Sequence, residues 1–258
     1  MLKKTKRGSF LVRFRENAYL CRAMSNRFFQ FKQFTVWHDR CAMKVGTDAV
    51  LLGAWATADA VERVLDVGCG SGVIALMLAQ RFPQAHVVGV ELDADAALQA
   101  SENVQASPWA NRLEVVQEDF CTYRPTACFD LIVSNPPYFI DALRPPLEER
   151  SLARHAAGLN YETLFRRSVE LLTTHGRVCV ILPTEVEMMA VDAAARNGLY
   201  VARKVRVFTK EGKPQRRVML SFGTVVSPVE TIDLFLLNAD GSDADAYRAL
   251  TADFYLKW

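Results

Sequence analysis

The tetrapeptide Asn135-Pro136-Pro137-Tyr138 directly follows the apolar run Phe129–Ser134. The Oδ1 atom of Asn135 and the backbone carbonyl of Pro136 are two acceptors that can take both protons of a planar amino group and so orient its lone pair. The two prolines stiffen the loop, and the Tyr138 ring can stack on a flat substrate. An isolated Asn-Pro-Pro is an ordinary turn, but in this setting the residues predict capture of a weakly nucleophilic amine for attack on an electrophile.

A glycine-rich loop lies upstream of this clamp. Gly68, Gly70 and Gly72 follow a short apolar run and precede a helical pattern, so the backbone there can turn tightly and approach a ligand closely. A dinucleotide fingerprint would need a further glycine at position 73, where this chain has Val73. With Asp66 two residues before Gly68, the loop resembles the first motif of class I methyltransferases, which implies S-adenosyl-L-methionine as the cofactor.

Acidic residues end the next two predicted strands. Glu91 is placed to accept hydrogen bonds from both ribose hydroxyls, as the acidic residue of such folds does. The same resemblance implies that Asp119 accepts from the adenine amine of the cofactor and that Phe120 packs on the ring. Thr47 and Asp48 begin an apolar helix, where helix capping alone would explain them. The resemblance assigns both of them to the methionine end of the cofactor.

A fold is needed that brings these loops together in space. Short apolar runs alternate with helix-length amphipathic stretches, which predicts βαβ units and a parallel sheet covered on both faces. The expected segments are Arg63–Val67, Val73–Arg81, Ala85–Glu91, Ala94–Gln105, Leu113–Gln117, Phe129–Ser134, Tyr161–Thr174, Arg177–Leu182 and Glu185–Asn197. Ligands of such sheets bind at the carboxyl ends of the strands, so the motifs should meet at one edge.

The pattern changes after the last of these helices. Tyr200–Phe208 and Arg216–Phe222 are β-rich runs without a helix between them, which predicts a hairpin. By resemblance the fold class is α/β: a Rossmann-like class I methyltransferase with a seven-stranded, mostly parallel sheet and an antiparallel terminal hairpin. We expect a basic extension over residues 1–32, the methyltransferase domain over 33–224, and a strand–helix extension packed on the core over 225–258.

The basic charge is local. Residues 1–44 hold eleven Lys or Arg and two acids, whereas the remainder holds 20 basic and 27 acidic residues. The Lys and Arg residues among the first 32 positions, interleaved with phenylalanines, suit phosphate contact and base stacking, although a merely solvated tail, or an upstream start for residues 1–23, explains the same composition.

The six cysteines lack metal or disulfide spacing, and no long apolar run is present. We therefore expect a cytoplasmic protein with no metal, no membrane and no obligate protein partner.

Residues 31–258 resemble a bacterial family of tRNA adenine-N6 methyltransferases that modifies the adenosine 3′ to the anticodon of valine tRNA. The resemblance is carried by the two motifs above and by Phe34–Trp55, Val207–Arg217 and Leu250–Lys257. It implies catalytic roles for Asn135, Pro136 and Tyr138 and a tRNA substrate. The residues expected to contact the base or the RNA are Phe139, Arg154, Lys210, Lys213 and Arg217.

Three alternatives share parts of this pattern. Release-factor methyltransferases use the same clamp for a protein glutamine amide, but they usually carry a helical domain before the core. Methylation of adenine N6 in ribosomal RNA or DNA needs the same chemistry, and for DNA no room remains for a target-recognition domain. A non-catalytic subunit that only binds cofactor or RNA is disfavoured by the intact Asn135, Asp66, Glu91 and glycine loop.

Overall fold

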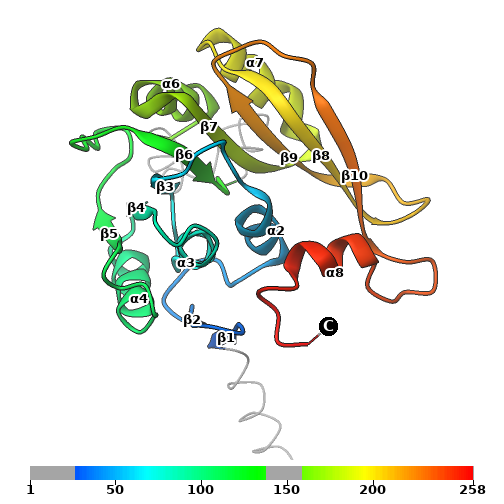
Figure 1. Cartoon of the computed structure of the whole chain (residues 1–258), viewed down its shortest axis with the longest axis horizontal. Helices are drawn as coiled ribbons and strands as arrows, with labels where there is room; N and C mark the ends of the chain where they lie inside the picture. The colour runs from blue at the N-terminus through cyan, green and yellow to red at the C-terminus, as the bar shows by residue number, and fades with distance from the viewer. Residues whose placement is uncertain (1–26, 138–158, 258) are drawn as a thin grey trace, which may run out of the picture.

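The computed structural model describes residues 27–137 and 159–257, and its centre is a twisted eight-stranded sheet (Figure 1). The strand order is β10-β8-β9-β7-β6-β3-β4-β5. A separate two-stranded hairpin is formed by β1 and β2. The strands are β1 Phe28–Gln30, β2 Thr35–Trp37, β3 Arg63–Val67, β4 His86–Glu91, β5 Leu113–Gln117, β6 Phe129–Ser134, β7 Leu172–Pro183, β8 Tyr200–Lys210, β9 Gln215–Gly223 and β10 Glu230–Leu237.

Helices cover both faces of the sheet. One apolar cluster lies between the sheet and α2, α3, α4 and α8, and a second lies between the sheet and α6 and α7 (Figure 1). The described helices are α2 Thr47–Trp55, α3 Val73–Arg81, α4 Ala94–Gln105, α6 Tyr161–Leu171, α7 Glu187–Arg196 and α8 Asp245–Thr251, with a short 3₁₀ turn, η2, over Thr184–Val186. Within the described ranges, no helix is long and apolar enough to cross a membrane.

The relative directions of the paired strands match the prediction made from the alternation of apolar and amphipathic runs. The strands β5, β4, β3, β6 and β7 pair in parallel, and β9 is antiparallel to both β7 and β8. These seven strands are the expected sheet with its antiparallel terminal hairpin. The strand β10 adds an eighth, which pairs with β8 in parallel and covers that edge. Within this eight-stranded sheet, the carboxyl ends of all strands except β9 therefore lie at one edge.

The amino-terminal phenylalanines need a partial correction. Phe31 is only 1% exposed, stacks on Phe34 with ring centroids 4.6 Å apart and also faces Tyr255. The backbone N–H of the next residue, Lys32, donates to the carbonyl of Phe254 at 2.8 Å. Phe31 is thus a core residue and not a stacking surface for nucleobases, because the β1–β2 hairpin folds against the carboxyl-terminal segment. Phe28 remains 45% exposed, and residues 1–26 lie outside the described part of the chain.

Candidate active site

Strand register brings the clamp beside the glycine loop. The strands β3 and β6 are parallel neighbours in which Val67 lies opposite Ser134, so the next residues, Gly68 and Asn135, leave the sheet side by side. The Ser134 hydroxyl donates to the carbonyl of Val67 at 2.9 Å and joins the two strand ends. On the other side of β3, Val67 pairs with Val90, which places Glu91 next to the same loop. The sequence prediction that these motifs meet at one edge is confirmed.

The glycine loop is open where a ligand would approach. Gly68 and Gly70 have φ angles of 69° and 55°, which only glycine adopts without strain, and no heavy atom lies within 4 Å of a Cβ built at either residue. The side chain of Asn103 supports the loop. Its Nδ2 atom donates to the Ser71 carbonyl at 2.9 Å and to the Trp37 carbonyl at 2.7 Å. Asn103 lies in the last turn of α4, where no sequence signal marked it as a support of the loop.

Asp66 lies beneath the loop with no solvent exposure. Its Oδ2 accepts from the Ala75 N–H in the first turn of α3 at 3.0 Å, while its Oδ1 has no hydrogen-bond partner among the described residues. Burial raises the pKa of the carboxyl group to about 7, the Ala75 hydrogen bond lowers it in part, and the nearby Glu91 raises it further. A buried acceptor of this kind favours a ligand that brings a hydrogen-bond donor or a positive charge.

Glu91 and Asp119 follow β4 and β5 at the same edge. Glu91 accepts the Gly70 N–H on Oε2 at 2.8 Å and the Asp93 N–H on Oε1 at 3.0 Å. Each carboxylate oxygen has a second lone pair, so both can still accept from a diol. Asp119 uses Oδ1 to cap the Cys121 N–H at 2.8 Å and is partly exposed. Phe120 is 4% exposed and belongs to the core cluster beneath, so its contact with a bound ring stays a prediction.

The clamp itself presents an unsatisfied acceptor. The Oδ1 atom of Asn135 is buried and, among the described residues, has no hydrogen-bond partner. Pro136, which follows it, is buried. Tyr138, Phe139 and Arg154 lie outside the described residues, so their predicted roles remain expectations. An orphaned amide oxygen beside an open glycine loop is what the amine-capture hypothesis requires, since a buried acceptor without a donor is costly unless a ligand supplies one.

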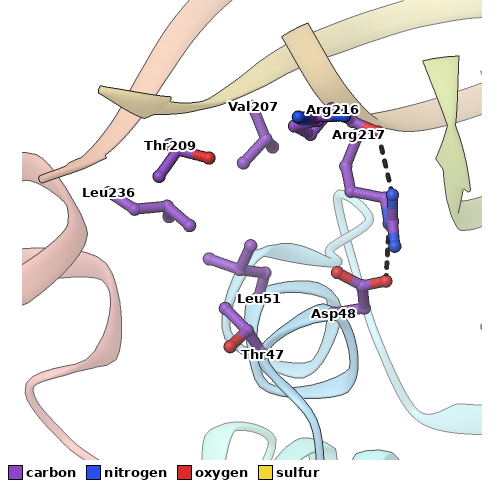
Figure 2. A pocket seen from close by; sticks show the side chains of 8 residues that line it. All are labelled: Thr47, Asp48, Leu51, Val207, Thr209, Arg216, Arg217 and Leu236. Carbon is purple, nitrogen blue, oxygen red and sulfur yellow. Dashed lines mark hydrogen bonds and ion pairs between the residues drawn. The ribbon is translucent and has the colours of Figure 1, made fainter. Parts of the chain in front are cut away.

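The helix start at Thr47 and Asp48 faces the terminal hairpin. The Asp48 Oδ2 forms an ion pair with the Arg217 Nε on β9 at 2.7 Å, and both side chains are partly buried (Figure 2). The pair borders a cavity that also contacts Thr209 of β8. Sequence reasoning had placed Asp48 and Arg217 in separate roles, at the cofactor and at the RNA. Nothing in either local sequence signals this contact across 169 positions.

The remaining predicted RNA contacts lie at the tip of the β8–β9 hairpin. Lys210 ends β8 and Lys213 is exposed in the turn that follows. Neither forms an ion pair with any described residue, whereas three other cations of β8 are paired: Arg203 with Glu230, Lys204 with Glu187, and Arg206 with Asp233. No group of three or more His, Cys, Asp or Glu side chains suited to a metal occurs within residues 27–137 and 159–257.

Comparison with known proteins decides the family. The model of the methyltransferase small domain family matches residues 42–192. The tRNA1(Val) (adenine(37)-N6)-methyltransferases of Bacteroides thetaiotaomicron and Aeromonas hydrophila are 47% and 46% identical to this chain, over 90% of it and 99% and 98% of those proteins. The chain belongs to this methyltransferase family. It is therefore an S-adenosylmethionine-dependent enzyme, as the motifs predicted.

Solved structures agree on the fold. A predicted O-methyltransferase, Atu636 from Agrobacterium tumefaciens, superposes with a TM-score of 0.62 at 18% identity and covers 80% of this chain and 96% of that one. The glycopeptide N-methyltransferase MtfA, solved with S-adenosyl-L-methionine, gives 0.53 at 14% identity over 72% of this chain and 96% of that one. These likenesses confirm the class I methyltransferase fold.

The residues at the sheet edge fit the cofactor. The open backbone at Gly68 and Gly70 leaves room for it, Glu91 keeps lone pairs that suit ribose hydroxyls, and the unpartnered Oδ1 of Asp66 suits a ligand that brings a hydrogen-bond donor. The assignments of Thr47, Asp48, Glu91, Asp119 and Phe120 to particular parts of the cofactor stay predictions.

Proposed function

We propose that this enzyme transfers a methyl group to N6 of the adenosine at position 37 of tRNA1(Val), the reaction that names its relatives. The observation that supports it best is the buried, unpartnered Oδ1 of Asn135 beside the open glycine loop. We place the reaction in the cytoplasm, where tRNA is found. Its substrate is a planar amine whose lone pair is delocalised into the purine ring.

The clamp acts by orientation. In the proposed complex, Asn135 Oδ1 and the Pro136 carbonyl accept the two amine protons, which favours a pyramidal nitrogen and directs its lone pair toward the glycine loop. S-adenosylmethionine supplies an electrophilic methyl group, whose bond to sulfur breaks as the new carbon–nitrogen bond forms. The nitrogen then releases a proton to solvent water, and these two acceptors stabilise the positive charge that develops before that release.

The strand ends set the geometry for this step. Because β3 and β6 are adjacent and their ends are joined by the hydrogen bond from Ser134 to Val67, the amine acceptors and the cofactor loop move as one unit. A target base inside a helix or a stacked loop cannot reach this edge. The adenosine must therefore leave its stack before transfer, as in other enzymes that act on bases.

A transcript test separates this proposal from its alternatives. Purified enzyme is incubated with labelled cofactor and with tRNA1(Val) transcript, the same transcript carrying guanosine at the target position, duplex DNA, or a release factor. We expect label only in the first, and nucleoside mass spectrometry should identify it as N6-methyladenosine. Label in the release factor or the DNA, with none in tRNA, would overturn the substrate assignment.

The clamp is tested by Asn135→Ala. We expect kcat to fall by about 100-fold or more, the scale of losing one preorganised hydrogen bond to developing charge, with little change in cofactor Kd. Asn111→Ala is the matched control, because Asn111 is exposed in the turn before β5 and is remote from the clamp. Full activity of Asn135→Ala would reject the amine-capture mechanism.

A further inference from the structure

A cavity of about 360 Å³ opens between the start of α2 and the strands β8, β9 and β10. Its walls are apolar at Leu51, Val207 and Leu236, which face the same space in Figure 2. Its remaining lining residues are polar: Thr47, Asp48, Thr209, Arg216 and Arg217. No residue of the glycine loop, of Glu91 or of the clamp lines it, whereas Thr47 and Asp48, which the resemblance assigns to the methionine end of the cofactor, do. The cavity thus extends from the start of α2 away from the glycine loop and toward the terminal hairpin.

The cavity lies at the same edge of the sheet as the clamp. Ser134, just before the clamp, pairs with Val180 of β7, and Arg217 pairs with Pro183 at the end of β7. Arg217 and the clamp are thus separated laterally by β7 alone, which is two strand spacings, or roughly 10 Å. A substrate held at Asn135 and continuing along this edge would pass the mouth of the cavity.

The charges around the cavity indicate which groups could bind inside it and which could bind at its rim. Arg217, the cation inside, is compensated by Asp48 at 2.7 Å, so the interior does not favour an anion. Arg216 at the rim is exposed and, like Lys210 and Lys213 on the same hairpin, has no ion pair with any described residue. The interior therefore suits a neutral, flat group with hydrogen-bonding edges, and the hairpin suits phosphates.

We propose that this cavity receives an unstacked nucleobase of a nucleotide next to the target adenosine. The inference rests on the proposed tRNA substrate and adds a specificity site to it. Single-stranded loops are recognised by splaying bases into pockets with apolar or guanidinium walls and polar groups at the base edges, which is the lining found here. Arg216, Lys210 and Lys213 then hold the backbone phosphates on either side.

The cavity is tested by filling it. Thr209 is exposed at the rim, so Thr209→Trp can project a ring into the space without disturbing the core. The matched control is Thr231→Trp, an exposed threonine at the opposite end of β10. With an anticodon stem-loop RNA, we expect Thr209→Trp to raise the RNA Kd about tenfold or more, the scale of losing one stacked base, and Thr231→Trp to leave it within twofold.

Abasic substrates identify the occupant. Wild-type enzyme should lose about tenfold in affinity when the base immediately 5′ or immediately 3′ of the target is removed, and at one of these positions only. Thr209→Trp should show no further loss at that position, because its cavity is already closed. Arg216→Ala should instead weaken all these RNAs equally and lower the salt dependence of binding.

Other results would overturn the inference. If the effects of Thr209→Trp and of each abasic position multiply, the cavity holds no flanking base. If Thr209→Trp raises the Kd for S-adenosylmethionine instead, the cavity belongs to the cofactor. If the wild-type enzyme methylates no tRNA at all, the proposed function fails and this site fails with it, whereas normal tRNA methylation by Thr209→Trp with unchanged RNA Kd refutes the cavity alone.

Discussion

The hydroxyl of Ser134 donates to the backbone carbonyl of Val67 at 2.9 Å, and both residues are buried. This bond joins the strand that carries the amine clamp to the strand that carries the cofactor loop. Positioning of this kind matters for methyl transfer because attack requires the nitrogen, the carbon and the leaving sulfur to be in line.

Ser134→Ala should therefore reduce both stability and catalysis. We expect the free energy of unfolding to fall by about 1 kcal/mol and kcat to fall by about tenfold, with little change in cofactor Kd. Ser101→Ala is the control, because the Ser101 hydroxyl also donates to a backbone carbonyl at 2.9 Å, but within α4. A similar loss of kcat in both variants would show that Ser134 has no special positioning role.

The buried Asp66 predicts an unusual pH dependence. Its pKa is about 7 in the folded protein and 3.8 when exposed, so the folded state binds the proton more tightly. Between these two values the wild-type protein should lose stability as pH rises, by up to ~1.4 kcal/mol per pH unit from this group. Asp66→Asn removes that loss, and its unfolding free energy without cofactor should exceed that of wild type at pH 8 and approach it only below about pH 4.

Denaturant titrations across this pH range make the measurement. Asp59→Asn, at an exposed aspartate, should keep the wild-type pH profile. Equal profiles for wild type and Asp66→Asn would mean that the carboxyl group is not held neutral in the fold. Above pH 7, where the wild-type carboxyl group is ionised, cofactor affinity should decrease in Asp66→Asn, since the substituted amide offers no negative charge to a cationic ligand.

Glu91 should govern cofactor binding more than chemistry. Its two oxygens accept backbone N–H groups from Gly70 and Asp93, and a glutamine has only one acceptor oxygen to replace them. We expect Glu91→Gln to raise the S-adenosylmethionine Kd about tenfold or more while kcat at saturating cofactor stays within about threefold. Glu114→Gln, on an exposed position of β5, is the comparison. Calorimetry measures the cofactor Kd, and saturation kinetics measure kcat. A large fall in kcat with an unchanged Kd would show that Glu91 serves the reaction itself.

Two phenylalanines of the β1 strand and its turn should behave differently. Phe31 is 1% exposed and Phe28 is 45% exposed. Phe31→Ala should lower the free energy of unfolding by about 3 kcal/mol or more, whereas Phe28→Ala should change it by less than about 1 kcal/mol. Chemical denaturation distinguishes them. A small effect of Phe31→Ala would contradict its assignment to the core.

The sequence was sufficient where the signal is local. Alternating apolar and amphipathic runs predicted the strands from β3 to β9 and the helices between them, and parallel pairing then required Gly68, Glu91 and Asn135 to meet at one edge. Each of these inferences depends on periodicity or on turn residues within a short window.

Contacts between distant segments could not be predicted in this way. Asp48 is a normal residue for a helix start and Arg217 a normal member of a basic hairpin, so neither reveals that they pair. The residues around Phe31 have the composition of a nucleic-acid-binding tail. The burial of Phe31 against Tyr255 could not be predicted, because it depends on the packing of residues more than 200 positions away. The eighth strand was recognised as a strand, but its parallel pairing with β8 follows from tertiary packing.

The backbone bond from Lys32 to Phe254 has a consequence for biosynthesis. A ribosome makes Phe31 early in this chain, yet Tyr255, on which its ring stacks, emerges more than 200 residues later. Until then Phe31 lacks this cover, although α4 and Trp109, which also contact the hairpin, are made much earlier. The packing around Phe31 is therefore completed only after the carboxyl-terminal segment has been made, even though the sheet can assemble progressively during synthesis.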